Sequence, residues 1–246
     1  MEAISKGTNG KTALIFVHGI VGNNRIFDFL QPLVQDKYKV EYVELKGHGG
    51  NALEFSHASM SQWKNQVERR VENLSARFSN VVGIGHSMGC LLLMGPAALG
   101  YLSGLFLLNP PMRITPKIRL FSNIFKVATG NMMNDPVTTA AKSAYSVSID
   151  FNPLHYYGWP KRYLELFAEV KRVREIVIPD LQISIDVILS RRDEMVSPSS
   201  AEVFTNMPDV NITILPNSTH YYYPAEDRKI IIDEFQQFLS RQTQCL

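Results

Sequence analysis

The feature that most constrains this chain is a serine between two glycines, at the junction of two apolar segments. Residues 85–89 are GHSMG, which matches the pattern G-x-S-x-G. They follow VVGI, a short run typical of a strand, and precede an uncharged run typical of a buried helix. A strand-to-helix turn this sharp favours glycine on either side and holds the serine hydroxyl at the top of a sheet. Ser87 is therefore the candidate nucleophile.

The rest of the chain alternates β-rich runs with segments of helical spacing, which predicts a mostly parallel sheet with helices on both faces. Strands are predicted at residues 12–17, 38–45, 81–84, 105–108, 183–189 and 210–215. Helices are predicted at residues 25–35, from a capping box at Ser59 to Phe78, from Ser87 to Leu99, and from about Pro224 onward. At 246 residues the chain suits a single α/β domain, since such domains reach about 250 residues.

The alternation lapses between the prolines at 110–111 and residue 182. We predict an α/β core at 1–111 and 182–246, with a small inserted cap at 112–181. The cap is expected to be apolar inside, first through Ile118, Leu120, Phe121, Ile124 and Phe125. An aromatic cluster follows at 155–159, and then a helix opened by Pro160 with Leu164, Phe167 and Val170 on one side.

Composition excludes several classes of protein. A net charge of +2, with 45% hydrophobic residues, argues against a basic nucleic-acid binder, so no nucleic-acid partner is expected. Two cysteines, Cys90 and Cys245, form neither a disulfide framework nor a metal-ligand set. With no secretory signal at the N-terminus, these features predict a cytoplasmic protein.

The uncharged stretch at 88–109 is nearly as long as a membrane span. Glycines and Pro96 interrupt it, which favours a buried helix followed by a buried strand. No stable membrane insertion is expected.

A serine nucleophile needs a histidine base and an acid that orients it. Asp193 lies just past the predicted strand at 183–189, and His220 lies just past the strand at 210–215, so both belong to the carboxyl edge of the sheet. Glu194 is the alternative acid, whereas Asp186 lies inside a strand. The weaker candidates for the base are His18, His48, His57, His86 and His155.

Six segments together resemble the α/β-hydrolase superfamily, and within it small bacterial carboxylesterases and monoacylglycerol lipases. They are LIFVHGIVGN at 14–23, KGHG at 46–49, GHSMG, LLNPP at 107–111, SRRDEMVSP at 190–198 and NSTH at 217–220. The resemblance implies an oxyanion hole formed by the backbone N–H groups of Ile20 and Met88. It covers nearly the whole chain apart from the predicted cap.

These residues predict a serine hydrolase that cleaves small or acyl-glycerol esters with an apolar acyl group and needs no metal or other cofactor. Candidate substrate-binding residues are Phe121, Phe125, Tyr157, Trp159 and Tyr221. The same machinery can cleave a thioester, an amide or a carbon–carbon bond, and a ligand-binding receptor with this fold is a further alternative. The sequence sets no oligomeric state.

The first part of the cap is basic, through Arg113, Lys117, Arg119 and Lys126. Two interpretations stand: an interfacial lid that contacts lipid surfaces, or a cap helix with a solvated basic face. We favour the solvated face.

Overall fold

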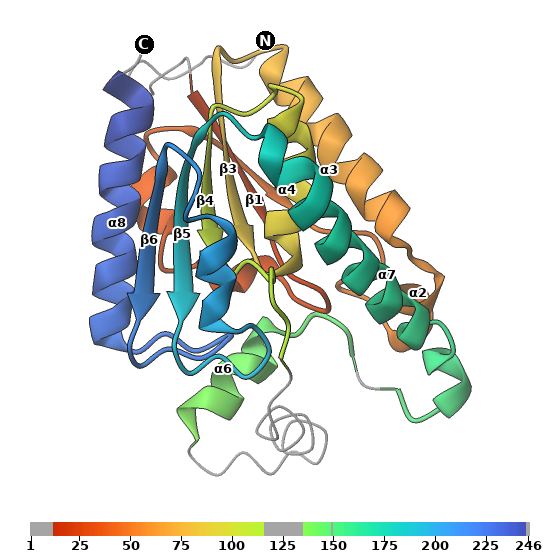
Figure 1. Ribbon diagram of the computed structural model, residues 1–246. Coiled ribbons are helices and arrows are strands. Elements are labelled where there is room, and N and C mark those ends of the chain that lie inside the picture. Colours follow the sequence, from red (N-terminus) through yellow and green to blue (C-terminus); the bar gives the residue numbers. More distant parts are fainter. Residues whose placement is uncertain (1–11, 116–134, 149, 245–246) are drawn as a thin grey trace.

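The computed structural model describes residues 12–115, 135–148 and 150–244, and these form a six-stranded parallel sheet (Figure 1). The strand order is β2-β1-β3-β4-β5-β6, and every neighbouring pair is parallel. The strands are β1 (Thr12–Val17), β2 (Lys39–Val43), β3 (Asn80–His86), β4 (Gly104–Leu108), β5 (Ser184–Ser190) and β6 (Val210–Leu215). The predicted α/β fold and all six predicted strands are confirmed.

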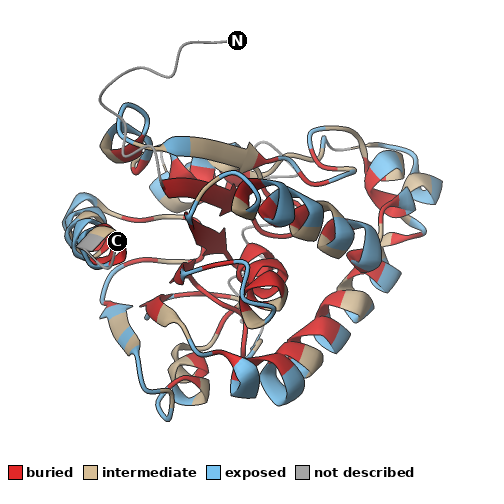
Figure 2. Ribbon diagram, turned by 90° about the horizontal axis from the view of Figure 1, so that it is seen from above, coloured by how far each residue is buried: buried red, intermediate tan, exposed pale blue. Residues whose placement is uncertain are grey.

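Helices cover both faces of the sheet because each central strand is apolar on both sides. Along β1, Ala13, Ile15 and Val17 belong to one core cluster and Leu14 and Phe16 to the other. The first cluster includes side chains of α3 (Met60–Ser75), α4 (Met88–Ala98) and α7 (Trp159–Arg172), and the second includes those of α8 (Ala225–Gln244). Figure 2 shows buried residues gathered inside, with the outer sides of the surrounding helices exposed.

The elbow between β3 and α4 explains why glycines flank the serine. A Cβ on Gly85 would lie 2.7 Å from the backbone nitrogen of Cys90, and one on Gly89 would overlap the carbonyl oxygen of Val17 in β1. Ser87 itself has φ 52° and ψ −121°, a conformation that side-chain-bearing residues rarely adopt. The strained turn thus lets α4 start directly at the end of its strand.

The uncharged stretch forms α4 and β4, as expected for a buried helix followed by a strand. Of the helices in the described part of the chain, none has the length and apolar character needed to cross a bilayer.

The single helix predicted over 25–35 is wrong in detail. The segment forms a 3-10 helix, η1 (Asn24–Phe27), and a separate short helix, α1 (Gln31–Val34). The Asn23 side chain caps η1 by accepting a hydrogen bond from the Arg25 nitrogen at 2.9 Å. Pro32 then falls in the first turn of α1, where its missing N–H costs nothing, whereas inside one long helix it would remove a hydrogen bond. An unpredicted helix, α2 (Ala52–His57), also follows β2.

The helix predicted from Pro160 exists as α7, but its buried side is not the predicted one. Leu164 and Phe167 are 66% and 47% exposed, and of the predicted stripe Val170 alone is buried. The buried side of α7 consists of Arg162, Leu166, Glu169 and Val170.

Ion pairs explain how charged residues came to occupy the buried side of α7. Arg162 pairs with Glu165 at 3.0 Å. Glu169 pairs with Arg172 at 2.6 Å and reaches Lys64 of α3 at 3.2 Å. Charged side chains can be buried when they are paired in this way. A prediction based on the spacing of apolar residues does not identify them.

The predicted cap interval, 112–181, contains several described elements besides α7. They are α6 (Pro136–Ala144), η2 (Pro153–Tyr156), a π-helical segment η3 (Val173–Val177) and η4 (Ile178–Asp180). In Figure 1, α6 lies beyond the arrowheads of β5 and β6, whereas α7 contacts α3 and α4. The division into core and cap stays a prediction, and residues 116–134 lie outside the described residues.

We expect Gly89→Ala to lower the free energy of unfolding by about 3 kcal/mol, because the new methyl group overlaps the backbone of β1. The matched control is Gly95→Ala in the same helix, where the nearest atom to an added Cβ is 3.9 Å away. That change should alter the free energy of unfolding by less than about 1 kcal/mol. The helix preference of alanine over glycine is opposed by Pro96, which disfavours helical backbone in a preceding residue that has a Cβ. Urea unfolding measures both, and equal effects of the two variants would contradict the assigned packing.

Candidate active site

Ser87 lies at the carboxyl edge of the sheet, between the end of β3 and the first residue of α4. Its backbone nitrogen donates to the carbonyl of Leu108 at the end of β4, at 2.9 Å. The residue is 5% exposed. The backbone of Ser87 is therefore fixed by β3 and β4, and the residue is largely buried.

The structure brings the three predicted residues into one hydrogen-bonded chain. The Nε2 atom of His220 lies 3.1 Å from the Ser87 hydroxyl oxygen. Its Nδ1 atom lies 2.7 Å from Oδ2 of Asp193. His220 is fully buried and Asp193 is 1% exposed. This is the arrangement in which a carboxylate orients an imidazole toward a hydroxyl proton.

The Asp193 carboxylate is itself fixed by the backbone. Its other oxygen accepts hydrogen bonds from the backbone nitrogens of Met195 and Val196, each at 2.7 Å. One oxygen is thus anchored in its own loop, and the other is left to hold the imidazole of His220.

Two opposing effects act on the imidazole of His220. Burial by itself would lower its pKa, but the charge and hydrogen bond of Asp193, with a smaller contribution from Glu194, raise the pKa above its ordinary value. The surroundings therefore stabilise the protonated imidazolium, which is the form a base adopts after taking a proton.

The turn that carries Ile20 lies directly against the candidate nucleophile. A Cβ on Gly19 would lie 2.9 Å from Cβ of Ser87, so position 19 has no room for a side chain. The turn closes through a hydrogen bond from the nitrogen of Gly22 to the carbonyl of Gly19 at 3.1 Å, and Val21 within it has φ 51°. Met88, the second predicted donor, is the first residue of α4, where helical N–H groups lack an intrahelical partner.

Two buried histidines, His18 and His48, form hydrogen bonds at this turn. His48 accepts the backbone N–H of Val21 at 3.0 Å, and His18 accepts that of Leu45 at 3.3 Å. Their rings lie 4.8 Å apart. Burial lowers the pKa of His18 to about 4 and, together with the proximity of His18, lowers that of His48 to about 3. Both are neutral acceptors near pH 7, whereas the sequence offered them only as weaker candidates for the base.

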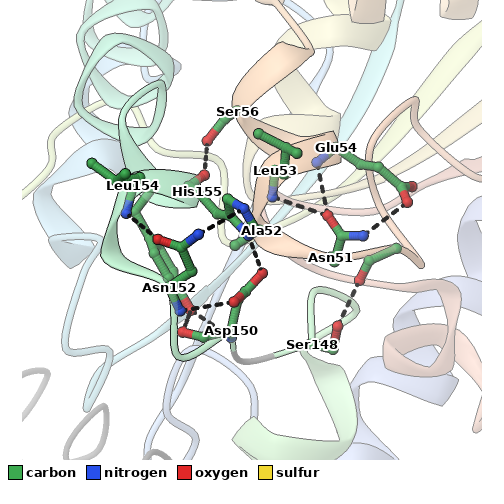
Figure 3. Close-up of polar contacts among 12 residues, drawn as sticks. Asn51, Ala52, Leu53, Glu54, Ser56, Ser148, Asp150, Asn152, Leu154 and His155 are labelled. Carbon is green, nitrogen blue, oxygen red and sulfur yellow. Dashed lines mark hydrogen bonds and ion pairs between the residues drawn. The ribbon is translucent and has the colours of Figure 1, made fainter.

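The remaining histidines lie outside the hydrogen-bonded chain of Ser87. The Nε2 atom of His86 donates to the carbonyl oxygen of His220 at 3.0 Å. Burial, and to a smaller extent the proximity of His220, lowers the pKa of His86 well below its ordinary value. His57 lies 3.3 Å from the Tyr157 hydroxyl. His155 pairs with Asp150 at 2.5 Å (Figure 3).

Of the described candidate substrate-binding residues, Tyr221 alone contacts the base. Its ring centroid lies 4.7 Å from that of His220. Tyr157 is 62% exposed, and the indole of Trp159 donates to the carbonyl of Ala52 at 3.1 Å. Phe121 and Phe125 lie outside the described residues. Substrate contacts for all five stay a prediction.

The segment that leads into α7 is tied to α2 by polar contacts. Figure 3 shows Ser148 and His155 reaching toward the residues around Asn51. The nitrogen of Ser148 donates to the carbonyl of Gly50 at 3.0 Å, and the Ser56 hydroxyl donates to the carbonyl of His155 at 2.5 Å. These contacts place the predicted aromatic cluster against α2.

Sequence reasoning missed two residues that hold His220. Asn109, with φ 49°, follows β4 and lies 3.4 Å from the carbonyl oxygen of His220 through its side-chain nitrogen. Glu194, considered only as a rival acid, accepts the backbone N–H of His220 at 3.2 Å. The signal was present in LLNPP and SRRDEMV, as polar residues at the carboxyl ends of β4 and β5.

Comparisons with known proteins agree with this fold. A family model described as the alpha/beta hydrolase family matches residues 14–234. A metagenome-derived lipolytic enzyme from the pair LipS and LipT has 20% identity and a TM-score of 0.71, with 96% of each chain covered. The monoacylglycerol lipase of Paleococcus ferrophilus has 15% identity and a TM-score of 0.67, covering 95% of this chain and 96% of that one. A carboxylesterase of the thaumarchaeon Nitrososphaera gargenis has 18% identity and a TM-score of 0.61, covering 98% and 94%.

We expect the buried neutral histidines to make the protein acid-sensitive. As pH falls below about 6.5 the unfolded chain binds protons that folded His18, His48 and His86 do not, so stability present above this pH is lost. Each such histidine contributes about 1.4 kcal/mol per pH unit to the slope.

The substitution His48→Gln keeps an oxygen that can accept the Val21 N–H but removes the titrating group. Between about pH 6.5 and 5, the unfolding of this variant should take up about one proton fewer than that of the wild type. Its slope of unfolding free energy against pH should therefore be smaller by about 1.4 kcal/mol per pH unit. His57→Gln, at an exposed position, is the control for the same substitution elsewhere in the chain. Urea unfolding across this range measures the slopes, and an unchanged slope in His48→Gln would show that His48 is not held neutral.

Proposed function

Because the chain belongs to the alpha/beta hydrolase family, we propose that it is a serine hydrolase that cleaves carboxylic esters through an acyl-enzyme at Ser87. The observation that carries this proposal is the hydrogen-bonded chain from Ser87 through His220 to Asp193, at 3.1 and 2.7 Å. The monoacylglycerol lipase and the carboxylesterase among the similar structures are consistent with ester substrates.

In the first step the Ser87 oxygen attacks the ester carbonyl carbon while His220 Nε2 takes the hydroxyl proton. The carbonyl π electrons move to oxygen, and the resulting oxyanion accepts hydrogen bonds from the backbone N–H groups of Ile20 and Met88. The Asp193 carboxylate stabilises the imidazolium and keeps its ring oriented. The tetrahedral intermediate then collapses, the C–O bond to the alcohol breaks, and His220 returns its proton to the leaving alcohol.

In the second step water replaces the alcohol. His220 takes a proton from water, the hydroxide oxygen bonds to the acyl carbon, and the bond to Ser87 breaks as its oxygen regains the proton. The products are a carboxylic acid, an alcohol and the free enzyme.

In the proposed function, the alcohol part of the substrate would occupy a polar cavity beside the turn that carries Ile20. It has a volume of about 600 Å³ and is lined in part by Gly22, Asn23 and Tyr145. Charged groups around it are Arg25, Asp28, Glu44 and Lys142. A lining of this kind favours a hydroxyl-rich alcohol such as a glyceryl group over an alkyl alcohol.

The decisive test is Ser87→Ala on a short-chain aryl ester. We expect kcat to fall by about 10⁴ or more, because no covalent intermediate can form. Ser240→Ala, at an exposed position on α8, is the matched control and should keep wild-type turnover. A fluorophosphonate should label the wild-type peptide containing Ser87, as measured by mass spectrometry. Equal turnover by Ser87→Ala and wild type would refute the proposal.

A panel of esters with one acyl chain tests the alcohol preference. The glyceryl ester should have a kcat/KM about tenfold above that of the ethyl ester, as expected from one or two hydrogen bonds to the cavity. Lys142→Met should narrow this ratio while leaving the ethyl ester unaffected. Identical kcat/KM values for the glyceryl and ethyl esters in the wild type would show that the cavity does not bind the alcohol part of the substrate.

A further inference from the structure

A second carboxylate is buried beside the acid of the site. Glu194 is 3% exposed and follows Asp193, which is 1% exposed, on the loop after β5. Removing a carboxylate from water is costly unless hydrogen bonds or positive charge compensate. Two adjacent buried carboxylates are therefore expected to accept hydrogen bonds from nearby groups.

Both carboxylates accept a hydrogen bond from His220, at different places on that residue. Asp193 contacts the ring at Nδ1, 2.7 Å away, whereas Glu194 accepts the main-chain N–H at 3.2 Å. The carbonyl of the same residue accepts from His86 at 3.0 Å. The backbone of His220 is thus fixed on both sides independently of its ring.

Glu194 adds a second negative charge beside that of Asp193. Its negative charge adds to that of Asp193 in raising the pKa of the His220 imidazole against the effect of burial. Burial and nearby negative charge raise the pKa of Tyr221 and of Tyr223, and burial lowers that of His86, so none of these offsets it. The titratable groups around His220 are Asp193, Glu194, His86, Tyr145, Tyr221 and Tyr223.

We propose that Glu194 is a positioning residue for His220, fixing its main chain by a hydrogen bond and stabilising its imidazolium by a second negative charge. The proposal rests on the proposed function, in which the imidazolium forms whenever Ser87 or water loses its proton. It deepens that function by assigning two separable contributions to one side chain. The hydrogen bond needs only an acceptor, whereas the electrostatic contribution needs the charge.

Two substitutions separate these contributions. In Glu194→Gln the amide oxygen still accepts the His220 N–H, but the charge is gone. In Glu194→Asp the charge remains on a side chain too short to make the same contact. Glu175→Gln, a half-exposed acid on η3, is the matched control for loss of a carboxylate elsewhere.

We expect the acid limb of kcat/KM in the wild type to have its midpoint above pH 6.5, since His220 must be deprotonated to act as a base. In Glu194→Gln that midpoint should move to lower pH, with kcat about tenfold lower and KM unchanged. Glu194→Asp should keep the wild-type midpoint but lose kcat, and Glu175→Gln should match the wild type throughout. Thermal unfolding checks that each variant folds.

A proton NMR titration of the His220 ring proton gives the same midpoints without substrate. A lower midpoint in Glu194→Gln by both methods supports the proposal. A folded Glu194→Gln with the wild-type midpoint overturns it. So does a Glu194→Gln variant that has lower thermal stability but wild-type kcat and midpoint. If the NMR midpoint shifts but no ester is turned over by the wild type, the proposed function fails while the positioning of His220 stands.

Discussion

The rest of the site depends on the close contact between the first turn of α4 and the end of β1. Because Gly89 leaves no side chain between them, the backbone of α4 approaches the carbonyl of Val17 directly. The same approach presses the turn at Gly19 against Ser87. The strained conformation of Ser87 and the turn packed against it are therefore consequences of one packing constraint. Glycine is required at position 89 because no space remains there for a side chain.

Electrostatics divides the buried histidines into two kinds. His18, His48 and His86 are buried without a facing carboxylate that outweighs burial, so their pKa values fall and they act as neutral hydrogen-bonding groups. His220 is equally buried, but the carboxylates beside it raise its pKa instead. Neighbouring charge, rather than exposure, thus distinguishes His220, the proposed base, from the three neutral histidines.

The sequence predicted the strands well because central parallel strands are apolar throughout and bounded by turns. It also predicted that Ser87, Asp193 and His220 each follow the carboxyl end of a strand, here β3, β5 and β6. Their catalytic roles stay predictions. It failed where local patterns conflict with tertiary contacts. The segment predicted as one helix over 25–35 forms two short helices, η1 and α1, with Pro32 in the first turn of the second. In α7, the buried side contains Arg162 and Glu169 in ion pairs, whereas Leu164 and Phe167 are exposed. The function of Glu194 required knowing which backbone group it meets.

The all-parallel sheet has a consequence for how the protein acquires its reactive centre. The elbow is made of residues adjacent in the chain, but His220 meets Ser87 across 133 positions. Contacts so distant in sequence form late, because loop-closure entropy must be overcome first. Synthesis proceeds from the N-terminus, so Ser87 is made before His220. A ribosome-bound chain would therefore contain the elbow before it contains His220, so the contact between Ser87 and His220 forms only after β6 and the loop that follows it have been added.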